Sequence, residues 1–464
     1  MSRSQAEIEP GAWLTLLVTS LAVFMISVEL TIIALALPEI RAAFHETSAA
    51  TLSWVVTAYN IGVASLLLVS GWLADRYGWR KFFITGTAVF AVASLAAGMA
   101  PDAPALIAAR VGQSIGGALQ YPAGLALLLS AFPQQRRQMA LGIYAGVGGL
   151  AAAVGPSLGA VLVDGFGWRA VFLVNVPVAT FAVIAGRRWL TESVSGDSRD
   201  RVDLIGVPLA SIGVGAIILA IVKGGDWGWG SSETIITFAV SGILIAVFFL
   251  RSRVHPAPLF DLSLFRLRTY ALGNLGTVFF ALAFFSWLIV LPSVLQIMWG
   301  WSVLRTGFAI APSPVVAFLL SPPAGRLADR IGNGPILAVG GLFGVIGSVL
   351  QLTLLSTKPG YVSGVLIPGL FIGVAAGLGF AQLVGASMQD VRPRRYGMAG
   401  AGRTTVFQLA TAIAIAIGFT LLGESSDPDE VLSAFRRVST LGAFGFGAQV
   451  LLFALVYPRS TTTS

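Results

Sequence analysis

Gly71-Trp72-Leu73-Ala74-Asp75-Arg76-Tyr77-Gly78-Trp79-Arg80-Lys81 is a charged, glycine-containing stretch between two long apolar segments. A looser copy occurs far downstream, as Gly325-Arg326-Leu327-Ala328-Asp329-Arg330-Ile331-Gly332-Asn333. Each copy directly follows the second long apolar segment of its half of the chain. Such a repeat indicates an internal duplication. Charged turns between apolar segments are typical of membrane proteins, and we expect each copy to form a short cytoplasmic turn.

The composition excludes an ordinary soluble protein. Of the 464 residues, 56% are hydrophobic and 11% are charged, whereas soluble domains carry about 25% charge. The apolar residues come in repeated stretches of roughly 18 to 26, which are long enough to cross ~30 Å of hydrocarbon as helices. We therefore expect an all-α membrane protein.

Several other classes of function are excluded by residue counts and spacing. The formal charge of +8 comes from basic residues scattered singly or in pairs, which form no nucleic-acid patch. The chain has no cysteine, and its two histidines, His45 and His255, fall in separate loops, so we expect no metal site. No Gly-x-x-x-x-Gly-Lys-Ser/Thr segment occurs, so the chain carries no ATP-binding loop and no cofactor is expected.

The hydropathy pattern predicts fourteen transmembrane helices, an even number that places both termini on one side. Lys and Arg then divide about three to one in favour of the side that holds the termini, which the positive-inside rule assigns to the cytoplasm. The predicted spans are 13–37, 51–72, 82–100, 103–131, 138–163, 170–190, 204–223, 234–251, 270–291, 303–324, 335–355, 361–388, 398–422 and 438–457.

The duplication divides the chain into two six-helix bundles with an inserted pair of helices. A charged, polar stretch at 191–203 reads as a linker, and the next two spans have no counterpart in either motif-bearing half. We predict an N-terminal bundle over 1–190, a linker with two extra helices over 191–262, and a C-terminal bundle over 263–464. The bundles would be related by a pseudo-two-fold axis along the membrane normal.

The charged turn is interpreted as a conformational latch. Asp75 would meet the positive N-terminus of a neighbouring helix, and an Arg of another, in only one of two states. Gly71 and Gly78 would let helix ends approach closely. The alternative is a positive-inside anchor with ordinary turn glycines. The latch residues would be Gly71, Asp75, Arg76, Gly78, Arg80 and Lys81, with Asp329 and Arg330 in the second copy.

The pattern Gly-x-x-x-Asp-Arg-x-Gly-x-Arg-Lys resembles the signature of the major facilitator superfamily. Span four is similar to that family's second motif, and span five to its antiporter motif. Span one resembles the motif of the fourteen-span drug:proton antiporter subfamily, with Glu29 where that subfamily usually has Asp. The matching residues are Leu106, Arg110, Gln113, Gly116 and Ala118 in span four; Gly142, Gly155, Pro156 and Gly159 in span five; Glu29, Thr31, Ala36, Leu37 and Pro38 in span one; and Trp168-Arg169, Asn175-Val-Pro177 and Pro258 to Phe265 elsewhere.

Glu29 is the carboxylate that the pattern buries most deeply within a span. A carboxylate in a membrane helix costs several kcal/mol and is functional by default, so we expect Glu29 to load and release a proton. Arg110 lies at a similar depth, because both are ~10–14 Å below the outer ends of their helices at 1.5 Å per residue. We expect Arg110, with Gln113 one turn on, to contact Glu29 in one state. The alternatives are a structural ion pair and a carboxyl that stays neutral.

Polar and aromatic residues within the spans are candidates for the substrate cavity. Ordinary hydrogen bonding between helices is at least as good an interpretation for each of them. Arg403 could instead extend to the cytoplasmic face. The candidates are Tyr59, Gln113, Tyr121, Asn274, Gln296, Gln382 and Arg403.

The glycines of span five, with Pro156, predict a smooth and kinked helix. Gly142, Gly155 and Gly159 would permit close packing against another span. The resemblance implies that this helix seals the two halves of a transport cycle, and the alternative is general helix packing in the membrane.

The resemblance implies proton-coupled efflux of lipophilic compounds by alternating access, driven by the proton gradient. Arginine far exceeds lysine, which suggests a bacterial host, and we expect the protein in the inner membrane. A single deep carboxylate favours a neutral or monocationic substrate. The partners would be that small molecule, protons and membrane lipids, with no nucleic acid, and the protein would act as a monomer. The alternatives are export of one endogenous metabolite, lipid or siderophore, and a membrane-embedded enzyme or sensor. An enzyme is disfavoured because no catalytic His, Cys or paired carboxylates fall in the spans.

Overall fold

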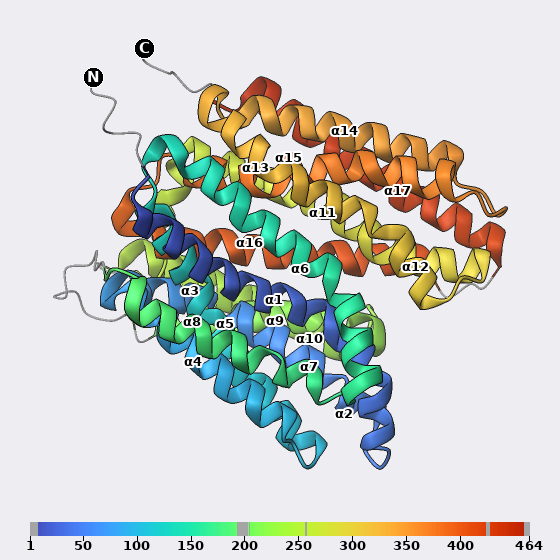
Figure 1. Cartoon of the computed structure of the whole chain (residues 1–464), viewed down its shortest axis with the longest axis horizontal. Coiled ribbons are helices and arrows are strands. Elements are labelled where there is room, and N and C mark those ends of the chain that lie inside the picture. Colours follow the sequence, from blue (N-terminus) through green and yellow to red (C-terminus); the bar gives the residue numbers. More distant parts are fainter. Residues whose placement is uncertain (1–7, 193–202, 204, 256–257, 424–426, 459–464) are drawn as a thin grey trace. The chain divides into compact units, whose positions relative to one another are not determined.

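The computed structural model describes residues 8–192, 203, 205–255, 258–423 and 427–458, and the regular elements in these residues are all helices. Figure 1 shows the helices. They are α1 (Pro10–Ala43), α2 (Ala49–Leu52), α3 (Trp54–Tyr77), α4 (Trp79–Gly98), α5 (Ala103–Ala131), α6 (Arg137–Phe166), α7 (Ala170–Leu173), α8 (Asn175–Trp189), α9 (Gly206–Trp227), α10 (Ser232–Val254), α11 (Arg268–Trp299), α12 (Val303–Ile310), α13 (Pro312–Ile331), α14 (Asn333–Leu354), α15 (Ile367–Met388), α16 (Tyr396–Leu422) and α17 (Pro428–Leu451).

Twelve helices in the described part of the chain are long and apolar enough to cross a membrane. A further pair, Ala103–Ala131 and Gln134–Ala151, meets the same criteria jointly but is bent by 114°, and it makes thirteen if it counts as one span. The prediction of an all-helical membrane protein is therefore confirmed. The count of fourteen stays a prediction.

The chain forms two compact units. The first comprises Met1–Pro133, Val154–Leu264 and Val391–Thr405, and the second comprises the rest. The first part of α6 thus belongs to the second unit, and the first part of α16 to the first unit. The predicted domains, 1–190, 191–262 and 263–464, are continuous stretches of sequence, whereas each compact unit combines three separate stretches. The predicted domains stay a prediction.

In the first unit, α4 and α5 pack backbone against backbone (Figure 1). A Cβ atom added to Gly86 would lie 2.7 Å from the backbone nitrogen of Gln120, and one added to Gly116 would lie 2.5 Å from that of Phe90. Only glycine allows helices to approach this closely. This contact places α5, which carries Arg110, directly against α4.

The inserted helices α9 and α10 also belong to the first unit, and polar contacts hold them. Asp203 accepts a hydrogen bond from the backbone N–H of Gly206 at 2.8 Å and pairs with Arg251 at 2.7 Å. Burial alone would raise the pKa of Asp203, but these hydrogen bonds and the charge of Arg251 hold it below its ordinary value. The Lys223 ammonium donates to the Ser53 hydroxyl at 2.7 Å, which ties α9 to the start of α3.

Glycines with positive φ form the two repeated turns. Gly78 ends α3 and precedes α4 with a φ of 112°, and Gly332 ends α13 and precedes α14 with a φ of 84°. L-residues with a side chain rarely adopt such angles. The two motif copies therefore turn the chain by the same device, at equivalent positions.

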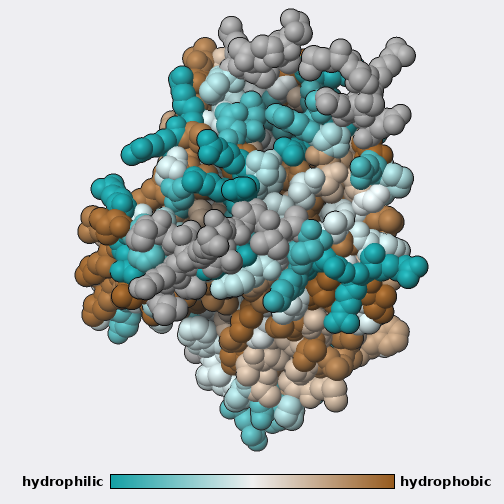
Figure 2. Space-filling model, turned by 90° about the vertical axis from the view of Figure 1, so that its left-hand side faces the viewer, coloured by the Kyte–Doolittle hydropathy of each residue, from teal (hydrophilic) through white to brown (hydrophobic). Residues whose placement is uncertain are grey.

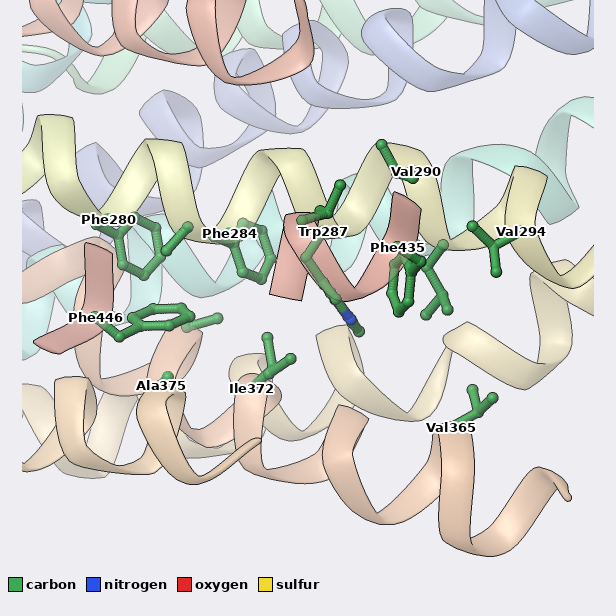
Figure 3. Packing of buried hydrophobic residues seen from close by; sticks show 14 of the residues in the cluster. Phe280, Phe284, Trp287, Val290, Val294, Val365, Ile372, Ala375, Phe435 and Phe446 are labelled. Carbon is green, nitrogen blue, oxygen red and sulfur yellow. The ribbon is translucent and has the colours of Figure 1, made fainter. Parts of the chain in front are cut away.

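An aromatic cluster forms the centre of the second unit. Figure 3 shows Phe280, Phe284 and Trp287 of α11 facing Phe446 of α17 and Ile372 of α15. The rings of Phe280 and Phe284 stack with centroids 5.4 Å apart. The indole N–H of Trp287 donates to Gln351 at 2.6 Å, which satisfies the one polar group that this ring buries.

Figure 2 shows hydrophilic side chains mainly in the upper and middle part of the face turned to the viewer, and hydrophobic ones at its left margin and in its lower part. This is the distribution expected where helix ends leave the hydrocarbon while helix flanks stay within it.

The contact between α4 and α5 gives a first prediction. Gly116→Ala should lower the thermal unfolding temperature in detergent, because the added methyl group overlaps the Phe90 backbone and overpacking costs about 1–3 kcal/mol. The control is Gly242→Ala in α10, where an added Cβ meets nothing within 4 Å. Equal unfolding temperatures for the two variants would contradict the close contact.

Candidate functional site

Glu29 lies on α1 and is fully buried, with a relative exposure of 0%. Its Oε1 atom forms an ion pair with the guanidinium of Arg110, which is 1% exposed. Its Oε2 atom accepts a hydrogen bond from the side-chain amide of Asn175 at 2.9 Å. Helices α1, α5 and α8 therefore converge on one carboxylate, and the two residues that the depth estimate paired are in contact.

Arg110 is held from several sides. Its Nε donates to the Val55 carbonyl at 2.7 Å, and its Nη1 donates to Oε1 of Gln113 at 2.7 Å. The guanidinium also lies over the ring of Tyr59, 4.3 Å from its centroid. Gln113 in turn donates to the Ser94 hydroxyl at 2.8 Å. These partners hold the guanidinium in place beside Glu29.

The chemistry of this site is that of a buried, paired charge. Two buried charges are stable together, but removing one leaves the other without compensation and costs about 3–5 kcal/mol. Protonation of Glu29 removes the negative charge and leaves Arg110 charged.

Asp75, in the first motif copy, binds the N-terminus of α16. Its carboxylate accepts hydrogen bonds from the backbone N–H groups of Gly397 and Met398, each at 2.7 Å. It also accepts one from the indole N–H of Trp79 at 2.7 Å. The first N–H groups of a helix have no acceptor within that helix, so Asp75 caps α16 from a different helix.

The other residues of the first motif copy take distinct places. Gly71 lets α3 approach α16, since a Cβ there would lie 2.5 Å from the Gly397 carbonyl oxygen. The guanidinium of Arg76 lies over the rings of Trp72 and Tyr77. Arg80 donates to the backbone carbonyl of Arg187, and Lys81 is exposed.

The second copy repeats the contact with different partners. Asp329 accepts hydrogen bonds from the backbone N–H groups of Gln138, at 3.0 Å, and Met139, at 3.2 Å, at the start of α6. A Cβ at Gly325 would lie 2.3 Å from the Gln138 carbonyl oxygen, and Arg330 is exposed. Each motif copy therefore supplies one carboxylate that caps one helix of the opposite half of the chain.

The predicted antiporter motif lies on α6. A Cβ at Gly142 would lie 2.6 Å from the carbonyl oxygen of Ser321 in α13, so this glycine permits a backbone contact. Gly155 and Gly159 are buried. The side chain of Pro156 lies outside the described residues.

The predicted cavity residues separate into two groups. Tyr59 and Gln113 belong to the Arg110 site. Asn274 donates to the Tyr270 carbonyl at 2.8 Å and Gln296 to the Pro292 carbonyl at 3.2 Å, which are contacts within α11.

The remaining cavity candidates are Gln382, Tyr121 and Arg403. Gln382 lies between the Leu378 carbonyl and the Gly325 N–H, and Tyr121 lies near Arg403. Arg403 is only 5% exposed, so in this structure it does not extend to the surface as one alternative expected.

Comparison with known proteins identifies the family. The model of the Major Facilitator Superfamily matches residues 19–415. The chain belongs to the Major Facilitator Superfamily. It is a multi-pass membrane transporter, and its bacterial relatives include a multidrug resistance protein and a tetracenomycin C resistance and export protein.

Two relatives and one solved structure illustrate the similarity. The chain is 34% identical to the multidrug resistance protein Stp of Mycobacterium tuberculosis, over 88% of this chain and 75% of that protein. It is 32% identical to the tetracenomycin C resistance and export protein of Streptomyces glaucescens, over 87% and 75%. The fold matches the proton:xylose symporter XylE with a TM-score of 0.67 at 14% identity, over 98% and 97%. The predicted resemblance is thus confirmed at the level of family and fold.

In this Major Facilitator Superfamily transporter, the contact between Asn175 and Glu29 was not predicted from sequence. Asn175 shares Glu29 with Arg110, although the sequence pattern named it only as part of a resemblance. Neither depth nor spacing reveals this contact, because it depends on which face of α8 packs against α1. The sequence signal that could have found it is the amide's position in an otherwise apolar span.

Asp75 gives a second prediction. Asp75→Asn should accelerate hydrogen exchange at the amides of Gly397 and Met398 by about 10- to 100-fold, because the variant loses one acceptor and the charge that together stabilise these N–H groups by ~1.5–3 kcal/mol. Exchange would be measured by mass spectrometry on the detergent-solubilised protein.

The second motif copy supplies the matched control. Asp329→Asn should accelerate exchange at Gln138 and Met139 and leave Gly397 and Met398 unchanged. The capping interpretation would be wrong if Asp75→Asn left the α16 amides as protected as in the parent protein.

Proposed function

We propose that this protein is a proton-coupled efflux transporter for lipophilic, neutral or monocationic compounds, working by alternating access. The observation that carries the proposal is the buried ion pair of Glu29 and Arg110. Ionisable groups inside a membrane protein commonly mark a proton pathway. The names of two relatives, a multidrug resistance protein and a resistance and export protein, support the direction of transport.

The charge of the site supports the choice of substrate. Arg110 neutralises the one carboxylate in this site, so no second negative charge is left there to attract a dication. When Glu29 binds a proton, the local charge becomes positive, which disfavours any cation bound nearby. Proton binding and substrate release would thereby be linked.

The capping contacts of Asp75 and Asp329 support alternating access. Each is a contact between a carboxylate and a helix N-terminus, which is worth little enough to break and remake. A state that releases one of these caps would free the helix that it holds. The glycine contact at Gly142 gives α6 a surface on which α13 can slide.

The topology that we propose keeps fourteen spans. Helices α5 and α6 contain 29 and 30 residues, and each is long enough to cross ~30 Å at 1.5 Å per residue. Both termini would then be cytoplasmic, in a bacterial inner membrane. The protein would act as a monomer in contact with membrane lipids, with the proton gradient as its energy source and no cofactor.

The test uses proteoliposomes with an imposed pH gradient and a fluorescent lipophilic cation. The parent protein should move the cation against its concentration gradient, whereas Glu29→Gln should only equilibrate it, because a glutamine cannot take up the proton. Glu39→Gln is the control on the same helix, since Glu39 lies about three turns from Glu29 and accepts a hydrogen bond from the Trp168 N–H at 3.0 Å, in the connection between α6 and α7. Equal accumulation by parent and Glu29→Gln would contradict proton coupling through Glu29.

The alternative function is proton-coupled export of one endogenous metabolite, lipid or siderophore. The same proteoliposomes distinguish the two by competition. Inhibition by several chemically unrelated lipophilic compounds supports the broad exporter, and insensitivity to all of them supports the specific one. Efficient export of a dication would contradict the proposed substrate charge.

A further inference from the structure

Asn175 lies at an interruption in the sixth predicted span. Helix α7 ends at Leu173, Val174 forms a turn, and α8 begins at Asn175. Pro177 has no backbone N–H, so the Leu173 carbonyl lacks its usual donor four residues on. The helix is therefore weakened where its polar side chain meets Glu29.

The side-chain amide of Asn175 contacts both sides of this interruption. Its Nδ2 donates to Oε2 of Glu29 at 2.9 Å, and it lies 3.5 Å from the Val171 carbonyl oxygen in α7. Asn175 is 3% exposed, so no bulk water replaces either contact.

The two oxygens of Glu29 differ in what their partners can do after protonation. Oε1 faces Arg110, and a guanidinium can only donate hydrogen bonds. A proton on Oε1 would therefore face another donor. Oε2 faces an amide, which carries an NH2 group and a carbonyl oxygen. By turning over, Asn175 can accept a hydrogen bond from a protonated Oε2.

Of the groups near Glu29, its one other hydrogen-bond partner in the described residues, the Arg110 guanidinium, cannot accept a hydrogen bond. The charged or titratable ones in the described residues are Arg110 of α5 and Tyr59 of α3, whose ring lies beneath the Arg110 guanidinium. From α8, the described contact is the Asn175 amide. It is the one partner of Glu29 here that can both donate and accept.

We infer that Asn175 is a positioning residue that binds the proton-carrying oxygen Oε2 of Glu29. Its contact with the Val171 carbonyl, at the junction of α7 and α8, changes when Glu29 is protonated. The inference rests on the proposed proton coupling through Glu29. With Glu29 ionised, the Asn175 NH2 group donates to Oε2. With Oε2 protonated, the amide turns over, accepts the new O–H, and withdraws its NH2 group from Val171.

The first test is the pH dependence of transport by Asn175→Leu, a variant of similar size without the amide. The pH of half-maximal transport should rise by about half to one unit, because a hydrogen bond to the ionised carboxylate is worth more than one to the neutral carboxyl. The substrate concentration for half-maximal transport should stay within about twofold of the parent value. Asn175→Gln, which keeps the amide, should restore the parent midpoint at least in part.

Gln120→Leu is the matched control. Gln120 is a fully buried amide on α5 that accepts from the Thr87 hydroxyl at 2.8 Å, away from Glu29. This variant should keep the parent midpoint. An unchanged midpoint in Asn175→Leu, or an equal displacement in Gln120→Leu, would overturn the inference.

A second measurement needs no variant at position 175. Infrared difference spectra between acid and neutral pH, recorded on protein with 13C-labelled asparagine, should show a label-sensitive amide band that accompanies protonation of the carboxyl. That band should vanish in Glu29→Gln. Its absence from the parent spectrum overturns the role of Asn175.

The outcomes separate this inference from the proposed function. If Glu29→Gln still accumulates substrate against its gradient, the proposed function fails and takes this inference with it. If Glu29→Gln is uncoupled while Asn175→Leu keeps the parent midpoint and the label-sensitive band is missing, only the role of Asn175 is wrong.

Discussion

The structure of the first unit depends on the cost of placing a charge in hydrocarbon. An isolated carboxylate at the position of Glu29 would cost several kcal/mol, and the protein offsets this cost with Arg110 on one oxygen and Asn175 on the other. Arg110 would be equally costly alone, and Val55, Gln113 and Tyr59 complete its surroundings. Helices α1, α3, α5 and α8 must therefore pack so that these groups meet. A change in the charge of Glu29 would therefore alter a set of contacts that involves all four helices.

In both copies of the repeated motif, an aspartate caps the N-terminus of another helix. A helix that begins against another part of the protein leaves its first N–H groups without acceptors. Asp75 supplies them for α16, and Asp329 supplies them for α6. In each copy a glycine at the start of the motif allows the backbones to touch, and a glycine with positive φ ends the helix that carries the carboxylate. The duplicated sequence therefore forms the same capping contact twice.

Much of the architecture could be predicted because hydrocarbon imposes simple rules. Apolar length predicts helices, since backbone polar groups must be satisfied within each span, and the described residues are helical as expected. The depth estimate brought Glu29 and Arg110 to the same level because rise per residue is constant along a helix. The number of spans was harder, because α5 and α6 join at a sharp bend and meet the criteria for a span only jointly.

The sequence by itself determined the class of protein, the positions of its helices and the charged residues that a membrane cannot leave unpaired, because composition, length and depth are properties of the chain alone. Only the tertiary structure decided which partners those residues have. The contact of Asn175 with Glu29, the caps on α16 and α6, and the burial of Arg403 depend on how each helix is rotated about its axis. Side-chain packing with neighbouring helices sets that rotation, and in these nearly uniformly apolar helices the sequence pattern leaves it open.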